Sequence, residues 1–285
     1  MTDSLTLSDT PEDLIDERPM KSGLMSGKRG LVMGVANDHS IAWGIAKALA
    51  AEGAELALTF QNDALGKRVA PLAEELGSAE RLYRCDVEDL TSVETMFSAL
   101  AEAWGTIDFL VHCIGFSDRN ELKGRYADTS RENFTRTMVI SAFSFTELAK
   151  RAAQMMPSGG AMLTLTFGGS TRVVPNYNVM GVAKAALEAS VRYLAADFGP
   201  ENIRVNAISA GPIRTLAGAG ISDARFMFNF HRAHSPLRRT VTIENVGGAA
   251  VYLLSKLSDG VTGEVHFVDA GYNIVSMPRP DEING

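Results

Sequence analysis

From residue 27 onward, short apolar runs alternate with segments whose apolar positions recur every three or four residues. The short runs are mostly apolar at consecutive positions, which is typical of strands in a sheet covered on both faces. The expected strands are Gly30–Val35, Glu55–Phe60, Arg81–Val87, Ile107–Ile114, Ala161–Phe167, Ile203–Ile208 and Glu264–Val268.

The periodic segments between these runs have recognisable helix ends. Ser40 precedes a helix that Gly53 ends, and Thr91 with Glu94 predicts a capping box before another helix. Later helices are expected over residues 131–156, 177–198 and 242–257. Strands that alternate with helices pair in parallel through right-handed crossovers. The chain is therefore predicted to be a single-domain α/β protein with a Rossmann-type doubly wound parallel sheet.

Three segments lie outside this alternation. Residues 1–26 are polar, acidic and aperiodic, so we expect a flexible N-terminal arm before a domain of residues 27–275 and a tail of 276–285. Between a late strand and the last helix, Gly211–Pro236 is long and carries glycines followed by aromatic side chains. Such an excursion is typical of a substrate-binding lid, although an ordinary packed helical insertion also fits.

Composition narrows the classes of function. The chain has 27 basic and 34 acidic residues, a net charge of −7, and so lacks the basic footprint of a nucleic-acid-binding protein. It has no apolar run long enough to cross a membrane, and its start does not resemble a signal peptide. Cys85 and Cys113 lie in apolar runs, as reduced core cysteines do. We expect a cytoplasmic protein that binds neither nucleic acid nor membranes.

The turn after the first expected strand has features of a dinucleotide site. Gly34 can make the tight turn, and Ser40 and Ile41 begin a helix whose N-terminus would face a pyrophosphate. Gly44 would allow close contact between helix and sheet. The usual G-x-G-x-x-G spacing is missing, so a glycine-containing turn without a ligand also fits.

The ends of the second and third expected strands carry candidate contacts to an adenosine. Gln61 stands where dinucleotide folds place the residue that contacts the ribose, and the absence of arginine there favours NAD over NADP. Lys67 and Arg68 lie close enough in the sequence to keep NADP as an alternative. Asp86 and Val87 suit the adenine edge, but Asp86 would equally serve as a cap for the next segment.

The fourth expected strand and a later helix supply the rest of the candidate site. Ile114 and Gly115 end that strand, and a glycine there lets the backbone pass close to a cofactor. Tyr177 and Lys184 are two helical turns apart and face one side of a helix, offset by about 20°. An ammonium beside a phenol lowers the pKa of the phenol and steadies its proton donation. Taken alone, this pair is also common on helices without catalytic roles.

Together these segments resemble the short-chain dehydrogenase/reductase superfamily, and within it the bacterial NADH-dependent enoyl-acyl-carrier-protein reductases. The superfamily's usual lysine four residues after the tyrosine is Gly181 here, and the wider spacing of Tyr177 and Lys184 is the hallmark of the enoyl reductase branch. The resemblance covers roughly residues 24–272. Further matching segments are Gly34–Gly44, Gln61–Asp63, Cys85–Val87, Ile114–Phe116, Ala210–Thr215, Gly263–Val265 and Val268–Gly271.

The resemblance implies NADH-dependent reduction of the trans-2 double bond of an enoyl thioester on acyl carrier protein, in fatty-acid elongation, by a homotetramer. It implies that the Tyr177 hydroxyl stabilises the enolate oxygen and that Lys184 anchors the nicotinamide ribose. Ile213 and Thr215 match the segment that holds the carboxamide, and Ser117 matches a residue near the thioester. Expected walls of the acyl channel, with aromatic core packing as their alternative, are Met180, Ile221, Phe226 and Phe228.

One position departs from the family. Members carry a second tyrosine ten residues before the catalytic one, where this chain has Phe167. Phe167 is expected to contact the substrate by packing only, and Thr164 and Thr166 either compensate for the missing hydroxyl or serve the strand. The departure keeps open another short-chain carbonyl reductase or alcohol dehydrogenase, and a non-catalytic NAD(H)-binding module.

Two further patterns are weaker evidence for functional sites. His231 and His234 have helical spacing but no third ligand follows them, so we expect no metal site. Four arginines near the end of the expected lid would form either a docking patch for acidic acyl carrier protein or a solvated rim. They are Arg225, Arg232, Arg238 and Arg239.

Overall fold

The computed structural model describes residues 23–215 and 224–277. Its centre is a seven-stranded parallel sheet with the strand order β3-β2-β1-β4-β5-β6-β7. The strands are β1 (Arg29–Met33), β2 (Glu55–Phe60), β3 (Leu82–Arg84), β4 (Phe109–His112), β5 (Gly160–Thr166), β6 (Ile203–Ala210) and β7 (Val265–Val268). The order reverses between β1 and β4, and sheets of this type bind ligands in the crevice beyond that point.

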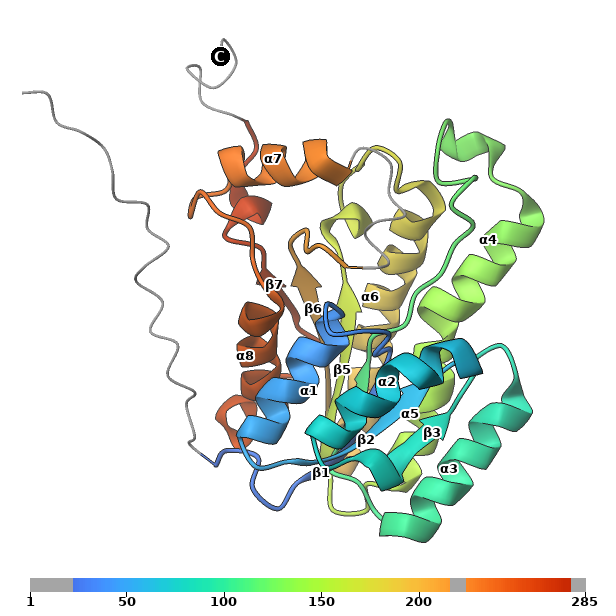
Figure 1. The fold of residues 1–285 in the computed structure, drawn as a ribbon. Helices are drawn as coiled ribbons and strands as arrows, with labels where there is room; N and C mark the ends of the chain where they lie inside the picture. Colours follow the sequence, from blue (N-terminus) through green and yellow to red (C-terminus); the bar gives the residue numbers. More distant parts are fainter. Residues whose placement is uncertain (1–22, 216–223, 278–285) are drawn as a thin grey trace, which may run out of the picture.

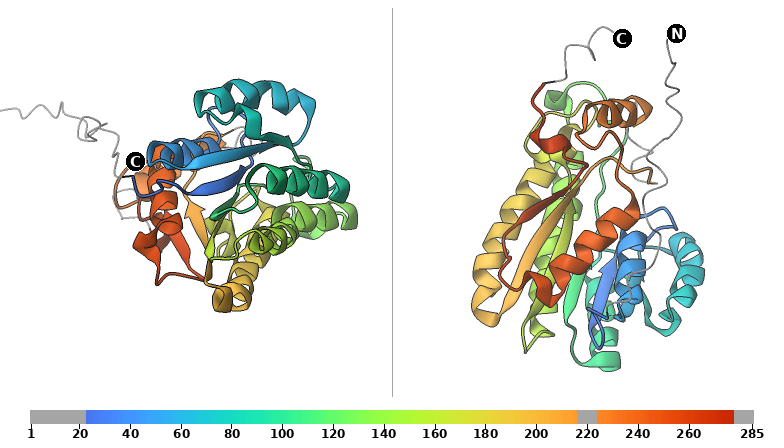
Figure 2. Two further views of the ribbon diagram at one scale, coloured as in Figure 1. Left: turned by 90° about the horizontal axis from the view of Figure 1, so that it is seen from below. Right: turned by 90° about the vertical axis from the view of Figure 1, so that its left-hand side faces the viewer.

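Helices cover both faces of the sheet (Figure 1, Figure 2). One apolar core is enclosed by α1 (Ile41–Ala51), α2 (Asp63–Glu75) and α8 (Ile243–Leu254). The other is enclosed by α3 (Leu90–Trp104), α5 (Ser144–Gln154) and α6 (Asn178–Phe198). The remaining segments are η2 (Ala79–Arg81), η3 (Tyr126–Asp128), α4 (Arg131–Met138), η4 (Val139–Phe143), η5 (Gly168–Ser170), η6 (Gly199–Glu201), α7 (Ala224–His234), η8 (Lys256–Ser258) and η9 (Tyr272–Ile274). The predicted doubly wound α/β fold is confirmed.

All seven expected strands are present, and several are shorter than the apolar runs that predicted them. The run predicted as 107–114 is paired only over β4, because Cys113 makes a last backbone bond to Met33 and the chain then leaves the sheet. The third run, predicted as 81–87, is paired only over three residues at the sheet edge. Apolar runs therefore extend past the strand ends into the loops that border the crevice.

The capping box predicted for Thr91 and Glu94 is wrong. The α3 helix begins at Leu90, and its N-cap is Asp89, whose carboxylate accepts the backbone N–H of Thr91. The Glu94 carboxylate instead accepts from the Arg151 guanidinium on α5 at 2.5 and 2.9 Å. Aspartate is an equally good N-cap, and its place directly before Leu90 decides the helix start.

Two helical segments differ from the sequence expectation. The helix expected over residues 131–156 is interrupted at Val139–Phe143 by a π-turn, which inserts one residue into the helical repeat and re-aims the side chains after it. The α2 helix was not predicted. Its buried Val69 and Ala73, with Leu72 and Leu76 partly buried beside them, do recur at helical spacing, and Pro71 lies inside the helix.

The packed part of the chain begins before the expected domain boundary. Residues 23–26 were assigned to the arm, but the Met25 side chain is 1% exposed and its backbone N–H bonds to the Glu52 carbonyl. Residues 1–22 and 278–285 lie outside the described residues, so the arm and most of the tail stay predictions. Within residues 23–215 and 224–277, no helix is long and apolar enough to cross a membrane.

Candidate active site

The candidate residues lie at the carboxyl ends of the strands. Gly34 follows β1, Gln61 follows β2, and Asp86 lies two residues beyond β3. Ile114 and Gly115 come directly after the end of the β4 ladder. Because parallel strands present their carboxyl ends on the same side, the fold brings these distant segments to one edge of the sheet.

Gly34 occupies a position that no other residue can fill without movement. Its φ of +97° lies in the left-handed region, and a Cβ on it would stand 2.1 Å from the Cys113 carbonyl oxygen. The ends of β1 and β4 therefore approach each other through this glycine. The predicted tight turn is present, and its tightness depends on tertiary contact as much as on φ.

Ser40 stabilises the loop before α1 rather than capping the helix with its side chain. Its Oγ accepts the backbone N–H groups of Ala36 and Asn37 at 3.0 and 3.1 Å, and α1 has no side-chain cap. The first turn of α1, which begins at Ile41, therefore presents its backbone donors at the carboxyl edge of the sheet. An anion such as a pyrophosphate suits such donors.

Gly44 permits contact with another helix, not with the sheet as expected. A Cβ on Gly44 would lie 2.5 Å from the Ile243 carbonyl oxygen, and a Cβ on Gly247 would lie 2.7 Å from the Gly44 carbonyl oxygen. The glycines thus allow α1 and α8 to cross closely. The first turns of both helices are held together beside the crevice.

Gln61 and Asp86 are neighbours across β2 and β3. The Gln61 side-chain amide donates to Asp86 Oδ2 at 3.2 Å, and Asp86 Oδ1 accepts the Glu88 backbone N–H at 3.0 Å. Asp86 therefore serves the local turn and also presents a polar edge next to Gln61. The Val87 side chain is buried in the core, so only its backbone can contact a ligand.

Tyr177 is the N-cap residue of α6 and is 8% exposed. Its ring packs edge-on against Phe167, with ring centroids 5.1 Å apart and an interplanar angle of 69°. Burial raises the pKa of the Tyr177 phenol, and the Glu188 carboxylate acts in the same direction. The expected lowering of this pKa by a lysine is therefore wrong. The phenol stays protonated near neutral pH and can act as a hydrogen-bond donor.

Lys184 is buried, and its Nζ donates to the Leu165 carbonyl oxygen at 2.9 Å. Burial lowers its pKa to about 8, against the opposing effects of Cys113 and Glu188. A Cβ built on Gly115 would lie 3.7 Å from this Nζ and 3.6 Å from Met180 Cε. The fold thus brings the end of β4 to the Lys184 and Met180 face of α6, as the sequence predicted for a site shared by these segments.

Ser117, expected near a thioester, has a hydroxyl held by side chains of α4. Its buried hydroxyl lies 3.3 Å from Asn133 Oδ1 and 3.0 Å from Thr137 Oγ1. These contacts tie the loop after β4 to α4. The geometry favours a structural role for the Ser117 hydroxyl.

A cavity of about 720 Å³ lies between the ends of β5 and β6, the α7 helix and η9. Phe167 and Phe226 line it from opposite elements, and Pro212 lines it from the loop after β6. Met180 does not line this cavity and packs near Gly115 instead. Ile221 lies outside the described residues. Two of the expected acyl-channel residues, Phe167 and Phe226, are thus brought together.

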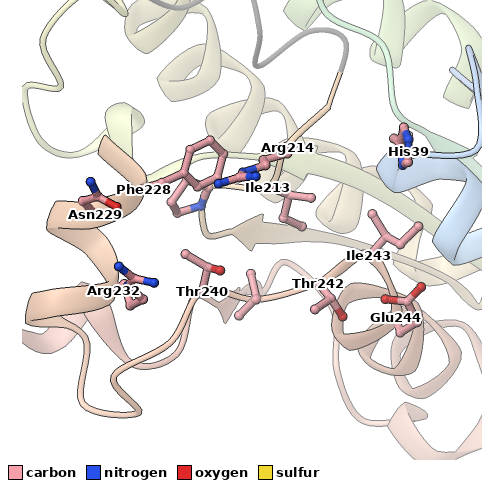
Figure 3. Close-up of a pocket in the computed structure, with 12 residues that line it drawn as sticks. His39, Ile213, Arg214, Phe228, Asn229, Arg232, Thr240, Thr242, Ile243 and Glu244 are labelled. Carbon is pink, nitrogen blue, oxygen red and sulfur yellow. The ribbon is translucent and has the colours of Figure 1, made fainter. Parts of the chain in front are cut away.

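A second cavity of about 410 Å³ lies between the loop after β1 and α7. Figure 3 shows Ile213 between His39 on one side and Phe228 on the α7 helix on the other. The Arg214 guanidinium lies over the Phe228 ring at 5.6 Å. Phe228, expected in the acyl channel, therefore borders this cavity and not the one that Phe167 and Phe226 line.

His231 and His234, both on α7, are held by ring contacts. The His231 ring lies 4.4 Å from the Tyr272 ring, and the His234 ring stacks on Phe230 at 4.0 Å. Among the residues that the structure describes, no group of three His, Cys, Asp or Glu side chains is arranged to hold a metal ion.

Sequence reasoning missed Ser141, which organises the loop after β4. Its hydroxyl accepts the Phe116 backbone N–H at 2.9 Å and donates to the Phe116 carbonyl oxygen at 3.0 Å. Ser141 lies in the π-turn, and a serine in the middle of a long periodic stretch carries no signal by itself. The contact exists only because the π-turn aims the hydroxyl at the loop.

Comparisons with known proteins agree with this geometry. A family model described as Enoyl-(Acyl carrier protein) reductase matches residues 34–273. The chain is 73% identical to "Enoyl-[acyl-carrier-protein] reductase [NADH] 2" of Rhizobium meliloti (strain 1021), over 90% of this chain and 96% of that protein. It is 52% identical to the enoyl-[acyl-carrier-protein] reductase [NADH] FabI of Escherichia coli (strain K12), over 90% of this chain and 97% of that protein.

Solved structures show the same likeness. The crystal structure of FabI from Candidatus Liberibacter asiaticus superposes with a TM-score of 0.88 at 59% identity, covering 90% of this chain and 99% of that chain. The enoyl-(acyl-carrier-protein) reductase from Anaplasma phagocytophilum in complex with NAD gives 0.87 at 57% identity, covering 90% and 97%. Because both the sequence and the fold match over nearly the whole described chain, this protein belongs to the enoyl-(acyl carrier protein) reductase family.

Proposed function

We propose that this protein catalyses the NADH-dependent reduction of the trans-2 double bond of enoyl thioesters carried by acyl carrier protein, in fatty-acid elongation. The observation that carries the proposal is a buried, protonated Tyr177 with Lys184 two turns along the same helix, in a chain 73% identical to a reductase of that name. The carbonyl-reductase alternative lacks its tyrosine–lysine spacing here, because Gly181 stands where that lysine belongs.

The edge of the sheet fits a dinucleotide at three points. Gly34 leaves no room for a side chain at the turn, the first turn of α1 is uncapped by side chains, and the backbone at Gly115 passes close to the Lys184 ammonium. NADH, when bound, supplies the hydride. The residues that would hold it are Gly34, Ser40, Ile41, Gln61, Asp86, Val87, Ile114, Gly115, Lys184, Ile213 and Thr215.

The chain's own contribution to the reaction is a placed hydrogen-bond donor. As the double bond is saturated, negative charge collects on the thioester oxygen, and the neutral Tyr177 phenol would donate to that oxygen. One such donor stabilises the transition state by about 2.7–4 kcal/mol. Phe167 has no hydroxyl to share this role, and its ring instead supports the Tyr177 ring edge-on. Lys184 would hold the nicotinamide ribose through its hydroxyl groups.

An assay of the whole protein tests the proposal directly. Wild-type protein is mixed with crotonyl and longer enoyl thioesters, with NADH and NADPH in parallel, and cofactor absorbance is followed. We expect oxidation of NADH that depends on the enoyl thioester, with NADPH much poorer. Oxidation with a panel of ketones but not with enoyl thioesters would favour a carbonyl reductase. Tight NADH binding without any oxidation would favour a non-catalytic binding module.

We also propose that four copies assemble and that the tetramer works in the cytoplasm. Exposed apolar side chains on α6 and the π-turn support burial by another copy, with Tyr193 76% and Phe143 53% exposed. Neither Cys85 nor Cys113 forms a disulfide, which suits a reducing compartment. Acidic acyl carrier protein would dock near α7, where Arg225, Arg232, Arg238 and Arg239 are exposed.

A further inference from the structure

A buried carboxylate lies on the same helix as Lys184, one turn further along. Glu188 is 7% exposed, and its Oε1 accepts the Thr166 hydroxyl at 2.6 Å. Thr166 is itself buried near the end of β5. Aspartate and glutamate are almost never this buried without a partner, so the burial of the Glu188 carboxylate requires an explanation.

Glu188 and Lys184 bind neighbouring residues of the same strand. The Lys184 ammonium donates to the carbonyl oxygen of Leu165, and the Glu188 carboxylate accepts from Thr166, the next residue of β5. Side chains four residues apart on a helix are neighbours, so the two opposite charges lie on one face of α6. The contact between β5 and α6 thus includes one cationic and one anionic side chain.

The other titratable groups near Lys184 are neutral, which distinguishes Glu188 from them. Two titratable side chains on β4 and the loop after it, His112 and Cys113, lie near enough to interact electrostatically with Lys184. Burial lowers the pKa of His112 to about 3 and raises that of Cys113 to about 12, so both are neutral when the lysine titrates. Tyr177, at the start of α6, is also neutral there because burial raises its pKa. Of the two groups that raise the pKa of Lys184, Cys113 and Glu188, only Glu188 is a carboxylate.

We propose that Glu188 is a positioning residue of the reductase, whose carboxylate, held by Thr166, keeps the Lys184 ammonium charged and fixed against β5. The inference rests on the proposed function. A buried ammonium without an opposite charge loses its proton more readily, because a low-dielectric environment disfavours the charged form. Removing the carboxylate therefore lowers the pKa of Lys184 further, and the cationic form that would hold the ribose is lost at a lower pH.

The test compares Glu188→Gln with Asp197→Asn, across a pH series. The substituted amide keeps an acceptor for Thr166 without the charge, and Asp197 is an exposed acid on the same helix. For Glu188→Gln we expect kcat/KM about tenfold below wild type at about pH 8.5 and within about twofold at about pH 6.5. The Kd for NADH, measured by fluorescence without enoyl thioester, should weaken over the same pH range. Asp197→Asn should match wild type in both measurements.

Two results would overturn the inference. One is a pH profile of Glu188→Gln that superposes on wild type, and the other is an equal loss at every pH, which indicates a purely structural role.

If Glu188→Gln does not fold, Glu188→Asp replaces it in the test, since aspartate keeps the charge but its side chain is one methylene shorter. At alkaline pH, the loss of kcat/KM in Glu188→Asp should lie between no loss and the loss of about tenfold expected for Glu188→Gln. A wild-type pH profile in Glu188→Asp would contradict the inference. Failure of the proposed function is distinguishable, because wild-type protein would then not oxidise NADH at all.

Discussion

The Tyr177 phenol is held by burial on one side and by the Phe167 ring on the other. The edge-on contact of the two rings holds the Tyr177 ring, and burial keeps the hydroxyl protonated. Such a group can donate a hydrogen bond without first having to lose or gain a proton. At the residue scale, the proposed mechanism therefore depends on one neutral donor placed before the substrate arrives.

Replacing that donor tests its role. In Tyr177→Phe we expect kcat to fall about 10²–10³-fold, because one oxyanion donor is lost while the ring that packs on Phe167 remains. The Kd for NADH should stay within about twofold of wild type, measured by fluorescence titration. As a matched control, Tyr193→Phe removes an exposed hydroxyl from the same helix and should leave kcat unchanged. An unaltered kcat in Tyr177→Phe would remove this hydroxyl from the mechanism.

At the element scale, the site is built from turns that close between neighbouring strands. The turn after β1 approaches the end of β4 through Gly34, and the π-turn aims Ser141 at the loop after β4. α1 and α8 cross closely through Gly44 and Gly247. The edge where the cofactor is proposed to bind is therefore rigid because several backbones are in direct contact.

Substitution of Gly34 by alanine should lose both stability and cofactor binding. A left-handed φ costs about 1–2 kcal/mol for a residue with a Cβ, and here the Cβ also meets the Cys113 carbonyl oxygen at 2.1 Å. Gly124→Ala is the control, since Gly124 has a φ of +79° with nothing within 4 Å of the Cβ. Thermal unfolding and NADH titration should show a larger loss of Tm for Gly34→Ala, and a loss of NADH affinity for it alone. Equal losses of Tm in both variants would contradict the steric argument.

The positions of two phenylalanines on α7 lead to a prediction about acyl chain length. Phe226 lines the larger cavity with Phe167, whereas Phe228 lines the smaller one. Each buried methylene contributes about 0.8 kcal/mol, so Phe226→Ala should raise KM for long enoyl thioesters about 5–10-fold and leave crotonyl thioester nearly unaffected. Phe228→Ala should not change this preference. Steady-state kinetics over a series of chain lengths measures both, and the same loss at every length would place Phe226 outside the acyl site.

At the scale of the whole molecule, several large apolar side chains of the described chain are exposed. Tyr193 on α6 and Phe143 on the π-turn are more than half exposed, on elements whose other faces pack on the sheet. A tetramer would bury such positions, and burial of apolar area drives association. The site itself lies at the carboxyl edge of the sheet within one copy, so assembly is expected to affect stability more than chemistry.

A charge placed on that surface should disrupt the assembly. For Tyr193→Glu we expect a smaller species in analytical ultracentrifugation, because a carboxylate is costly to bury without a partner. Ala64→Glu, at an exposed position of α2 on the other face of the sheet, serves as the control and should sediment as wild type. A wild-type protein that sediments as a monomer would refute the tetramer outright.

Much of this protein was predictable from local patterns. The seven strands and the Gly34 turn follow from apolar periodicity and motif spacing, which depend on neighbours in the chain. The start of α3 was mispredicted because two acceptable caps, Asp89 and Thr91, lie two residues apart. Ile221, expected in the acyl channel, lies outside the described residues, so that prediction stays open.

By itself, the sequence determined the parallel α/β architecture, the family and the residue types at the carboxyl edge, since these depend on short-range periodicity and on motif spacing. Only the tertiary structure decided the electrostatics, because burial is a property of the assembled core. It reversed the expected pKa shift of Tyr177, assigned Phe226 and Phe228 to different cavities, and placed the Glu188 carboxylate against Thr166. Those outcomes depend on which distant segments come into contact, and no local pattern records that.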